Sequence, residues 1–96
     1  MKLEVITPEK KLFEGNAKAI QFPGINGSFQ LLENHAPIIS ALGKGKIKID
    51  LDDSIKELEI MENEVERDDS SDKIIRLTIN GGVVECRNNK VIVLAD

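Results

Sequence analysis

Two residues of this chain belong to types that commonly bind metals or carry catalysis, and each occurs once: His35 and Cys86. A structural zinc site needs a cluster of Cys and His ligands, and no second soft ligand lies near either residue in the sequence. A Ser or Cys nucleophile would need His35 as its base and a third group to orient it, and no such group is adjacent. We therefore expect no catalytic residue, no cofactor site and no metal site.

Two further segments resemble ligand-binding motifs only in part. Gly43-Lys44-Gly45-Lys46 lacks both the earlier glycine and the following Ser or Thr of a phosphate-binding loop, so we expect an exposed turn with two lysines. Asp50-Leu51-Asp52-Asp53 lacks the glycine that a calcium-binding EF-hand loop requires at its sixth position. We interpret these acids as part of a solvated acidic face.

The overall composition excludes several classes of function. The net charge is −4, and the only aromatic residues are Phe13, Phe22 and Phe29. Proteins that bind single-stranded nucleic acids use a basic groove with aromatic platforms, so we expect no nucleic-acid partner. A lone cysteine beside Val83 and Val84 is typical of a small buried side chain in a reducing compartment. We also expect no signal peptide and no membrane span, and hence a protein in the cytosol or on the cytosolic face of an assembly.

The hydrophobic pattern is that of β-strands. Apolar and polar residues alternate with a period of two around residues 2–7, 46–51 and 75–79, which is the mark of a half-buried strand. Residues 91–94 are apolar on both faces and predict a central or doubly covered strand. Frequent turn residues separate the strands, including Asn88-Asn89, which suits a two-residue type I′ turn. The sequence predicts a single all-β domain over residues 1–96, either an antiparallel sandwich or a flattened barrel.

The acidic residues gather in the middle of the chain. Residues 50–72 hold eleven of the seventeen acids and only two basic residues, Lys56 and Arg67. Residues 55–61 could extend as a strand, and residues 62–73 have the composition of a solvated loop. We expect residues 50–73 to form an extended acidic hairpin or loop. It is either a plain exposed hairpin, which we favour, or a docking arm for a basic surface.

Residues 23–42 are the most informative segment. They predict a tight glycine-rich turn, a short strand at Ser28–Leu32, a second turn at Asn34 and a rigid Pro37. The residue before a proline is restricted to extended conformations, so His35 should sit on a stiff corner. A stiff corner with a polar tip suits docking, because little conformational entropy is lost on binding.

This segment resembles the epsilon subunit of F-type ATP synthases. That family combines a Gly-x-x-Gly turn, an apolar strand residue, and His-Ala-Pro followed by two apolar residues and Ser or Thr. The matching residues here are Gly24, Gly27, Leu31, His35, Ala36, Pro37, Ile38, Ile39 and Ser40. Residues 3–15, 80–85 and 89–96 are similar to the family's opening, its Gly-Gly turn and its closing strand, so about three quarters of the chain is covered.

The resemblance implies a flattened β-sandwich of about ten short strands and a non-catalytic role. In the family this domain joins the gamma shaft to the membrane c-ring in the central stalk of a proton-transporting ATP synthase. It sits peripherally on the cytoplasmic face of the bacterial plasma membrane. By motif position, Thr7, His35 and Ser40 would face the gamma subunit, and Ser28 would face the c-ring.

Three departures from the family stand out. Ser28 stands where many relatives carry Glu, and Gln30 and Glu33 occupy positions that are often Gly and Pro. The family's usual C-terminal helical hairpin, which can block ATP hydrolysis and in some members binds ATP, does not follow Asp96. We expect the chain as given neither to inhibit by that route nor to bind nucleotide.

A different class of function stays open at this point, namely a small ligand-binding β-barrel or a generic protein-interaction domain. A ligand-binding barrel would need a pocket of roughly 300 Å³ or more, lined by aromatic and apolar side chains. Three phenylalanines and a set of aliphatics sized to fill a sandwich core argue against such a hollow interior.

Overall fold

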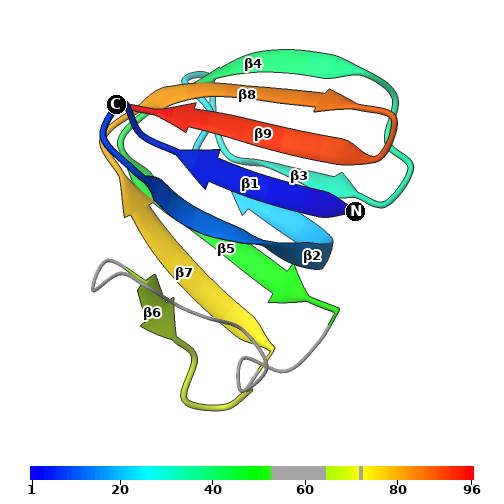
Figure 1. The fold of residues 1–96 in the computed structure, drawn as a ribbon, viewed down its shortest axis with the longest axis vertical. Helices are drawn as coiled ribbons and strands as arrows, with labels where there is room; N and C mark the ends of the chain where they lie inside the picture. The colour runs from blue at the N-terminus through cyan, green and yellow to red at the C-terminus, as the bar shows by residue number, and fades with distance from the viewer. Residues whose placement is uncertain (53–64, 72) are drawn as a thin grey trace.

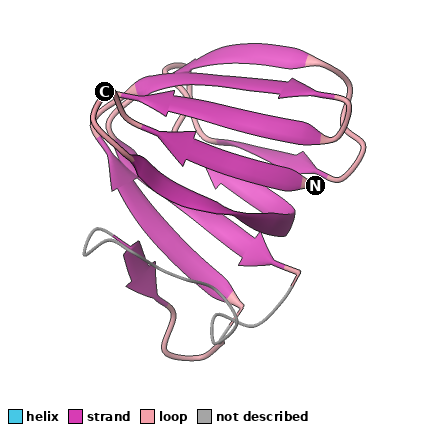
Figure 2. Cartoon of the chain, viewed as in Figure 1, coloured by secondary structure: helices cyan, strands magenta, loops and turns pink. Residues whose placement is uncertain are grey.

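The described part of the chain, in a computed structural model, consists of strands, turns and loops only (Figure 2). The description covers residues 1–52, 65–71 and 73–96. It contains nine strands, and the predicted all-β class is confirmed. Their bounds are β1 Lys2–Ile6, β2 Lys11–Phe22, β3 Phe29–Leu32, β4 Ile38–Leu42, β5 Gly45–Leu51, β6 Val65–Arg67, β7 Ile74–Ile79, β8 Gly82–Arg87 and β9 Lys90–Ala95.

The strands form two layers that share the long strand β2 (Figure 1). The strand order is β4-β8-β9-β1-β2-β5-β7-β6. Strand β3 lies off this path and pairs with residues 19–22 of β2. The first half of β2 pairs with β1, and its second half pairs with β3 and β5. Because twelve residues are enough to pass from one layer to the other, a single strand joins the two halves of the sandwich.

The core lies between the layers and follows the predicted alternation. Leu3 and Val5 of β1 are fully buried, as are Ile47 and Ile49 of β5 and Leu77 of β7. Each such aliphatic side chain contributes about 1.5–3 kcal/mol when it is removed from water. The ring of Phe22 stacks on that of Phe29 with 5.4 Å between centroids, so the few aromatic residues also serve the core.

The predicted turns and the predicted fate of the cysteine are confirmed. Asn88 and Asn89 both have positive φ, 52° and 60°, as a type I′ turn requires. Asn34 also has a positive φ of 62°, which marks the second turn of the segment that carries His35. Cys86 is 1% exposed and its thiol is free.

The acidic segment is described only in part. Residues 53–64 and 72 lie outside the described residues, and the expectation of a strand at residues 55–61 falls there. Residues 65–67 were expected within a loop, and this was wrong, because they form the edge strand β6 against β7. Two ion pairs accompany the pairing: Glu66 lies 3.0 Å from Lys46 and Asp68 lies 2.8 Å from Arg76, so these two acids have basic partners on β5 and β7.

Candidate docking surface

The outward side of β4, β8, β9 and β1 carries a continuous row of apolar side chains. The strand registers place Ala41 opposite Val83, Val83 opposite Leu94, and Leu94 beside Ile6. Val83 is 42% exposed and Leu94 is 57% exposed. The opposite faces of the same strands supply the core, so these apolar residues lie outside the sandwich and are not covered by the described part of the chain.

Two more exposed isoleucines extend this row. Ile39 lies two residues before Ala41 on β4 and is 72% exposed. Ile25 lies at the outer edge of β4, where its backbone N–H donates to the Ala41 carbonyl oxygen at 3.3 Å. Its side chain is 65% exposed. We call the set Ile6, Ile25, Ile39, Ala41, Val83 and Leu94 the apolar face.

Charged residues border the apolar face along the strands. Two residues further along the strands, the cross-strand neighbours are Ile39, Glu85, Ile92 and Glu4, in that order across the sheet. Two residues beyond these, the neighbours are Arg87, Lys90 and Lys2. An apolar centre with a charged rim is the usual anatomy of a protein–protein interface. Contiguous exposed apolar residues on a soluble domain commonly mark such a site.

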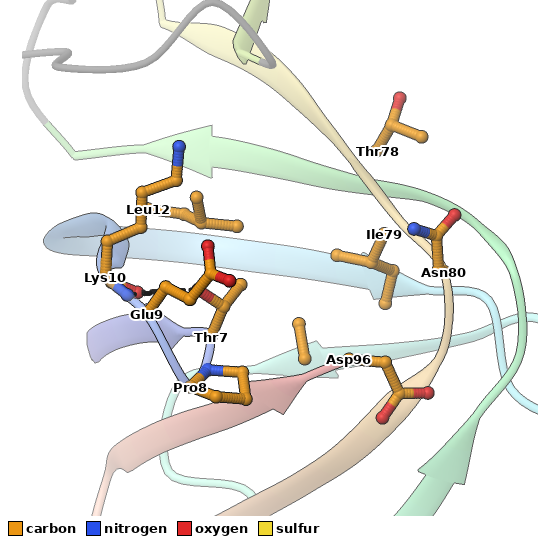
Figure 3. A pocket seen from close by; sticks show the side chains of 10 residues that line it. Thr7, Pro8, Glu9, Lys10, Leu12, Thr78, Ile79, Asn80 and Asp96 are labelled. Carbon is orange, nitrogen blue, oxygen red and sulfur yellow. Dashed lines mark hydrogen bonds between the residues drawn. The ribbon is translucent and has the colours of Figure 1, made fainter.

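Thr7 lies at one end of the apolar face, directly after Ile6, and closes the turn into β2. Its hydroxyl donates to the Lys10 carbonyl oxygen at 3.1 Å and accepts from the Lys10 N–H at 3.2 Å. Beside it is a hollow of about 400 Å³ whose other side is formed by Asn80 and Asp96 (Figure 3). No aromatic residue lines this hollow, which does not favour the alternative of a barrel built to hold an apolar ligand.

His35 lies at the other end of the same layer, in the loop before β4, and its side chain is exposed. Its Nδ1 is 2.6 Å from the carbonyl oxygen of Ala36. The corner is held on both sides: the Asn34 N–H donates to Asn89 Oδ1 at 2.8 Å, and Glu33 pairs with the α-ammonium of Met1 at 3.1 Å. The loop that carries His35 is therefore tied to the β8–β9 turn and to the start of β1.

Ser40 and Ser28 occupy different surroundings. Ser40 is paired with the fully buried Val84, so it shares the inward side of β4 with Leu42 rather than the side of Ile39. Ser28 is exposed just before β3 and borders a second hollow, near Lys46 and Lys48. The structure therefore does not bring Thr7, His35 and Ser40 into one cluster.

Sequence reasoning missed the residues that form the apolar face. A signal was present: residues 91–94 are apolar on both faces, which predicted a covered strand. The central position of β9, between β8 and β1, is confirmed. The described residues do not cover its outward side, where Leu94 is more than half exposed. A strand that is apolar on both faces, in a sequence that predicts no further layer to cover its outer face, was the available sign of a docking surface.

Within residues 1–52, 65–71 and 73–96, no group of three or more His, Cys, Asp or Glu side chains is placed to hold a metal ion. Over the same ranges, no helix is of a length and hydropathy that would let it span a membrane.

Comparison with known proteins gives a consistent set of relatives. The family described as "ATP synthase, Delta/Epsilon chain, beta-sandwich domain" matches residues 1–63. The ATP synthase epsilon chain of Chlorobium limicola is 33% identical over 95 residues, which cover 99% of this chain and 88% of that one. The epsilon chain of Leptospira interrogans (strain Fiocruz L1-130) is 38% identical over all 96 residues, and the match covers 61% of its length.

A solved structure has the same fold. A chain in the central stalk and c-ring of the Tetrahymena thermophila mitochondrial ATP synthase matches with a TM-score of 0.68 at 17% identity. The match covers 99% of this chain and 62% of that chain. At this identity the likeness concerns the fold alone.

Proposed function

Because the chain belongs to the ATP synthase delta/epsilon family, we propose that it is a non-catalytic subunit of the central stalk of a proton-transporting F-type ATP synthase. In that place it couples the gamma shaft to the c-ring during ATP synthesis. It would lie on the cytoplasmic face of the bacterial plasma membrane and reach the membrane only through the complex. The bacterial relatives support this location.

The observation that carries the proposal is the apolar face. A partner that covers Val83 and Leu94 would remove from water two side chains that are now 42% and 57% exposed. Exposed apolar surface supplies most of the affinity of a protein–protein contact, and the surrounding charges set its specificity. We assign this face to the gamma subunit.

The four residues singled out by the resemblance fit this arrangement to different degrees. Thr7 and His35 would border the gamma contact at its two ends. Ser40 lies on the opposite side of β4 from Ile39 and would not touch gamma; its hydroxyl donates to the Ala41 carbonyl oxygen at 3.4 Å. Ser28 remains the proposed contact to the c-ring, because it is exposed on the turn beyond the apolar face.

The test is reconstitution with the gamma subunit encoded in the same genome. The purified chain should show no ATPase activity and should elute with gamma as a complex with one copy of each on size exclusion. His35→Asp should weaken that complex while the circular dichroism spectrum stays that of the parent. A folded chain that fails to bind gamma would overturn the proposed function. An unchanged affinity of the His35→Asp variant would remove only His35 from the interface.

A further inference from the structure

A second hollow, of about 400 Å³, lies beside Ser28 on the outward side of the other layer. It is formed by residues from β2, β5 and β7 and from the turn before β3. We call it the basic groove, because three of its lining residues are cationic: Lys46, Lys48 and Arg76. The remaining lining residues are Gln21, Phe22, Pro23 and Ser28.

The cations of the basic groove are held close together by the sheet. The β5–β7 register places Lys48 directly opposite Arg76, and Lys46 lies two residues before Lys48 on the same side of β5. Side chains directly opposite each other in an antiparallel pair are about 4.5–5.5 Å apart at Cβ, and like charges there are destabilising. The arrangement therefore costs stability to the extent that acids do not offset these charges.

The described acids offset only part of this charge. Glu66 of β6 pairs with Lys46 at 3.0 Å, and Asp68 pairs with Arg76 at 2.8 Å. Asp50 lies two residues beyond Lys48 on the same strand. No ion pair or hydrogen bond connects the Lys48 ammonium to a residue of the described ranges, so among these residues Lys48 is the cation of the groove without an acidic partner.

The edge of the basic groove next to Ser28 is pre-organised. The Gly27 N–H donates to the Gly24 carbonyl oxygen at 3.1 Å, and the Pro23 carbonyl oxygen accepts from the Gly43 N–H at 2.7 Å. Gly45 packs so closely on Pro23 that a Cβ at this position would lie 2.8 Å from the Pro23 Cβ. A wall fixed in this way loses little entropy when a partner docks.

We propose that the basic groove binds an acidic side chain in the polar loop of a c-ring subunit, with Lys48 as the residue that pairs with its carboxylate. This inference rests on the proposed function, in which Ser28 is the contact to the c-ring. The Ser28 hydroxyl and the Gln21 amide supply neutral hydrogen bonds around the ion pair. In this contact the present chain supplies the positive charge, from Lys48, whereas many relatives supply a negative charge from an acid at the position of Ser28.

A lipid headgroup is a weaker fit for the same chemistry. Surfaces that bind anionic lipids by charge present clusters of roughly 4–8 basic residues. The basic groove has three, two of which already pair with acids. A net charge of −4 also opposes approach to an anionic bilayer.

The test measures binding of the purified complex of this chain with gamma to the c-ring from the same genome. Lys48→Glu should weaken ring binding about tenfold and Lys48→Gln about threefold, as expected for a charge pair at an interface. Lys73→Glu is the matched control, because Lys73 is exposed outside the groove, and it should change the affinity by less than about twofold. Raising NaCl from about 50 to about 300 mM should weaken the parent more than Lys48→Glu.

Two probes identify the source of the anion. A synthetic peptide of the ring subunit's polar loop should shift the Lys48 and Ser28 amide signals in NMR, and the peptide with its acids changed to amides should not. Vesicles of phosphatidylcholine with about 30% phosphatidylserine should not bind in a manner that depends on Lys48.

Three results would overturn the inference. They are a ring loop without an acidic residue, ring binding that is unaffected in Lys48→Glu while the gamma complex forms normally, and Lys48-dependent binding to vesicles but not to the peptide. The second of these leaves the proposed function standing, whereas failure to form the gamma complex overturns the proposed function itself.

Discussion

Val83 of β8 and Leu94 of β9 lie directly opposite each other on the outside of the sandwich, and both are exposed. Their chain neighbours Val84 and Val93 also form a directly opposite pair, and both of these are fully buried. At this end the β8–β9 hairpin is therefore apolar on both sides, although the described chain covers only one. This pair locates the centre of the surface that we assign to gamma.

Leu94→Gln should weaken the complex with gamma about tenfold, because a central apolar contact is replaced by a side chain that must be desolvated. The free energy of unfolding should change by less than about 0.5 kcal/mol, because the side chain is exposed in the isolated chain. Isothermal titration calorimetry and urea denaturation measure the two quantities.

Leu32→Gln is the matched control for this change. Leu32 is 56% exposed, close to the 57% of Leu94, but it lies on β3 outside the apolar face. Its replacement should leave gamma binding unchanged. Equal losses of affinity in the two variants would show that exposed leucines act through general hydrophobicity rather than through a defined surface.

Asn89→Gly should loosen the corner that carries His35. Glycine keeps the positive φ of the turn but removes the oxygen that accepts the Asn34 N–H. We expect a loss of about 0.5–1.5 kcal/mol in the free energy of unfolding and faster hydrogen exchange at the Asn34 amide. Asn88→Gly, in the same turn, should leave the Asn34 exchange rate as it is. If both variants behave alike, the turn conformation rather than the Asn89 side chain holds the corner.

The stability of the β6–β7 edge should depend on pH through Asp68. Hydrogen bonds from the Ser70 hydroxyl, from Arg76 and from the Ser70 N–H lower the pKa of Asp68 to about 2. A pKa below that of the unfolded chain, about 3.9, adds stability that is present above that value and is lost as the pH falls through about 2. The urea midpoint of the parent should therefore drop more between about pH 5 and about pH 2.5 than that of Asp68→Asn.

Asp69→Asn is the control for this pH dependence, because Asp69 is exposed and forms no ion pair with the described residues. It should follow the parent across the same pH range. A parent and an Asp68→Asn variant with parallel pH profiles would contradict the assignment.

Cys86 should be almost unreactive in the folded chain. Burial raises the pKa of its thiol and leaves the residue 1% exposed, so little thiolate is available and access is blocked. We expect Ellman's reagent to react at least about a hundredfold more slowly with the native chain than with the chain in concentrated urea. Rapid labelling of the native chain would show that the β4–β8 edge opens readily.

Local patterns in the sequence were enough to predict strands β1, β3, β5, β7 and β9. The period of two around Leu3, Ile47 and Leu77 gave the inward faces correctly, because alternation along a strand is a local property of the backbone. The turn at Asn88-Asn89 was predictable for the same reason, since positive φ depends on the residue itself. Strand β6 could not be predicted from composition, because its backbone pairing with β7 and the contact of Glu66 with Lys46, twenty residues away, are made only in the fold.

By itself the sequence determined the all-β class, the family resemblance and the stiff corner at His35. Only the tertiary structure decided which strands lie beside one another and which residues of distant strands share the outer surface. It joined Ile6, Val83 and Leu94 into one row, and it turned Ser40 inward and away from Thr7 and His35. The physical reason is that a surface is made by pairing between distant strands, and one change of register would move every side chain to the other face.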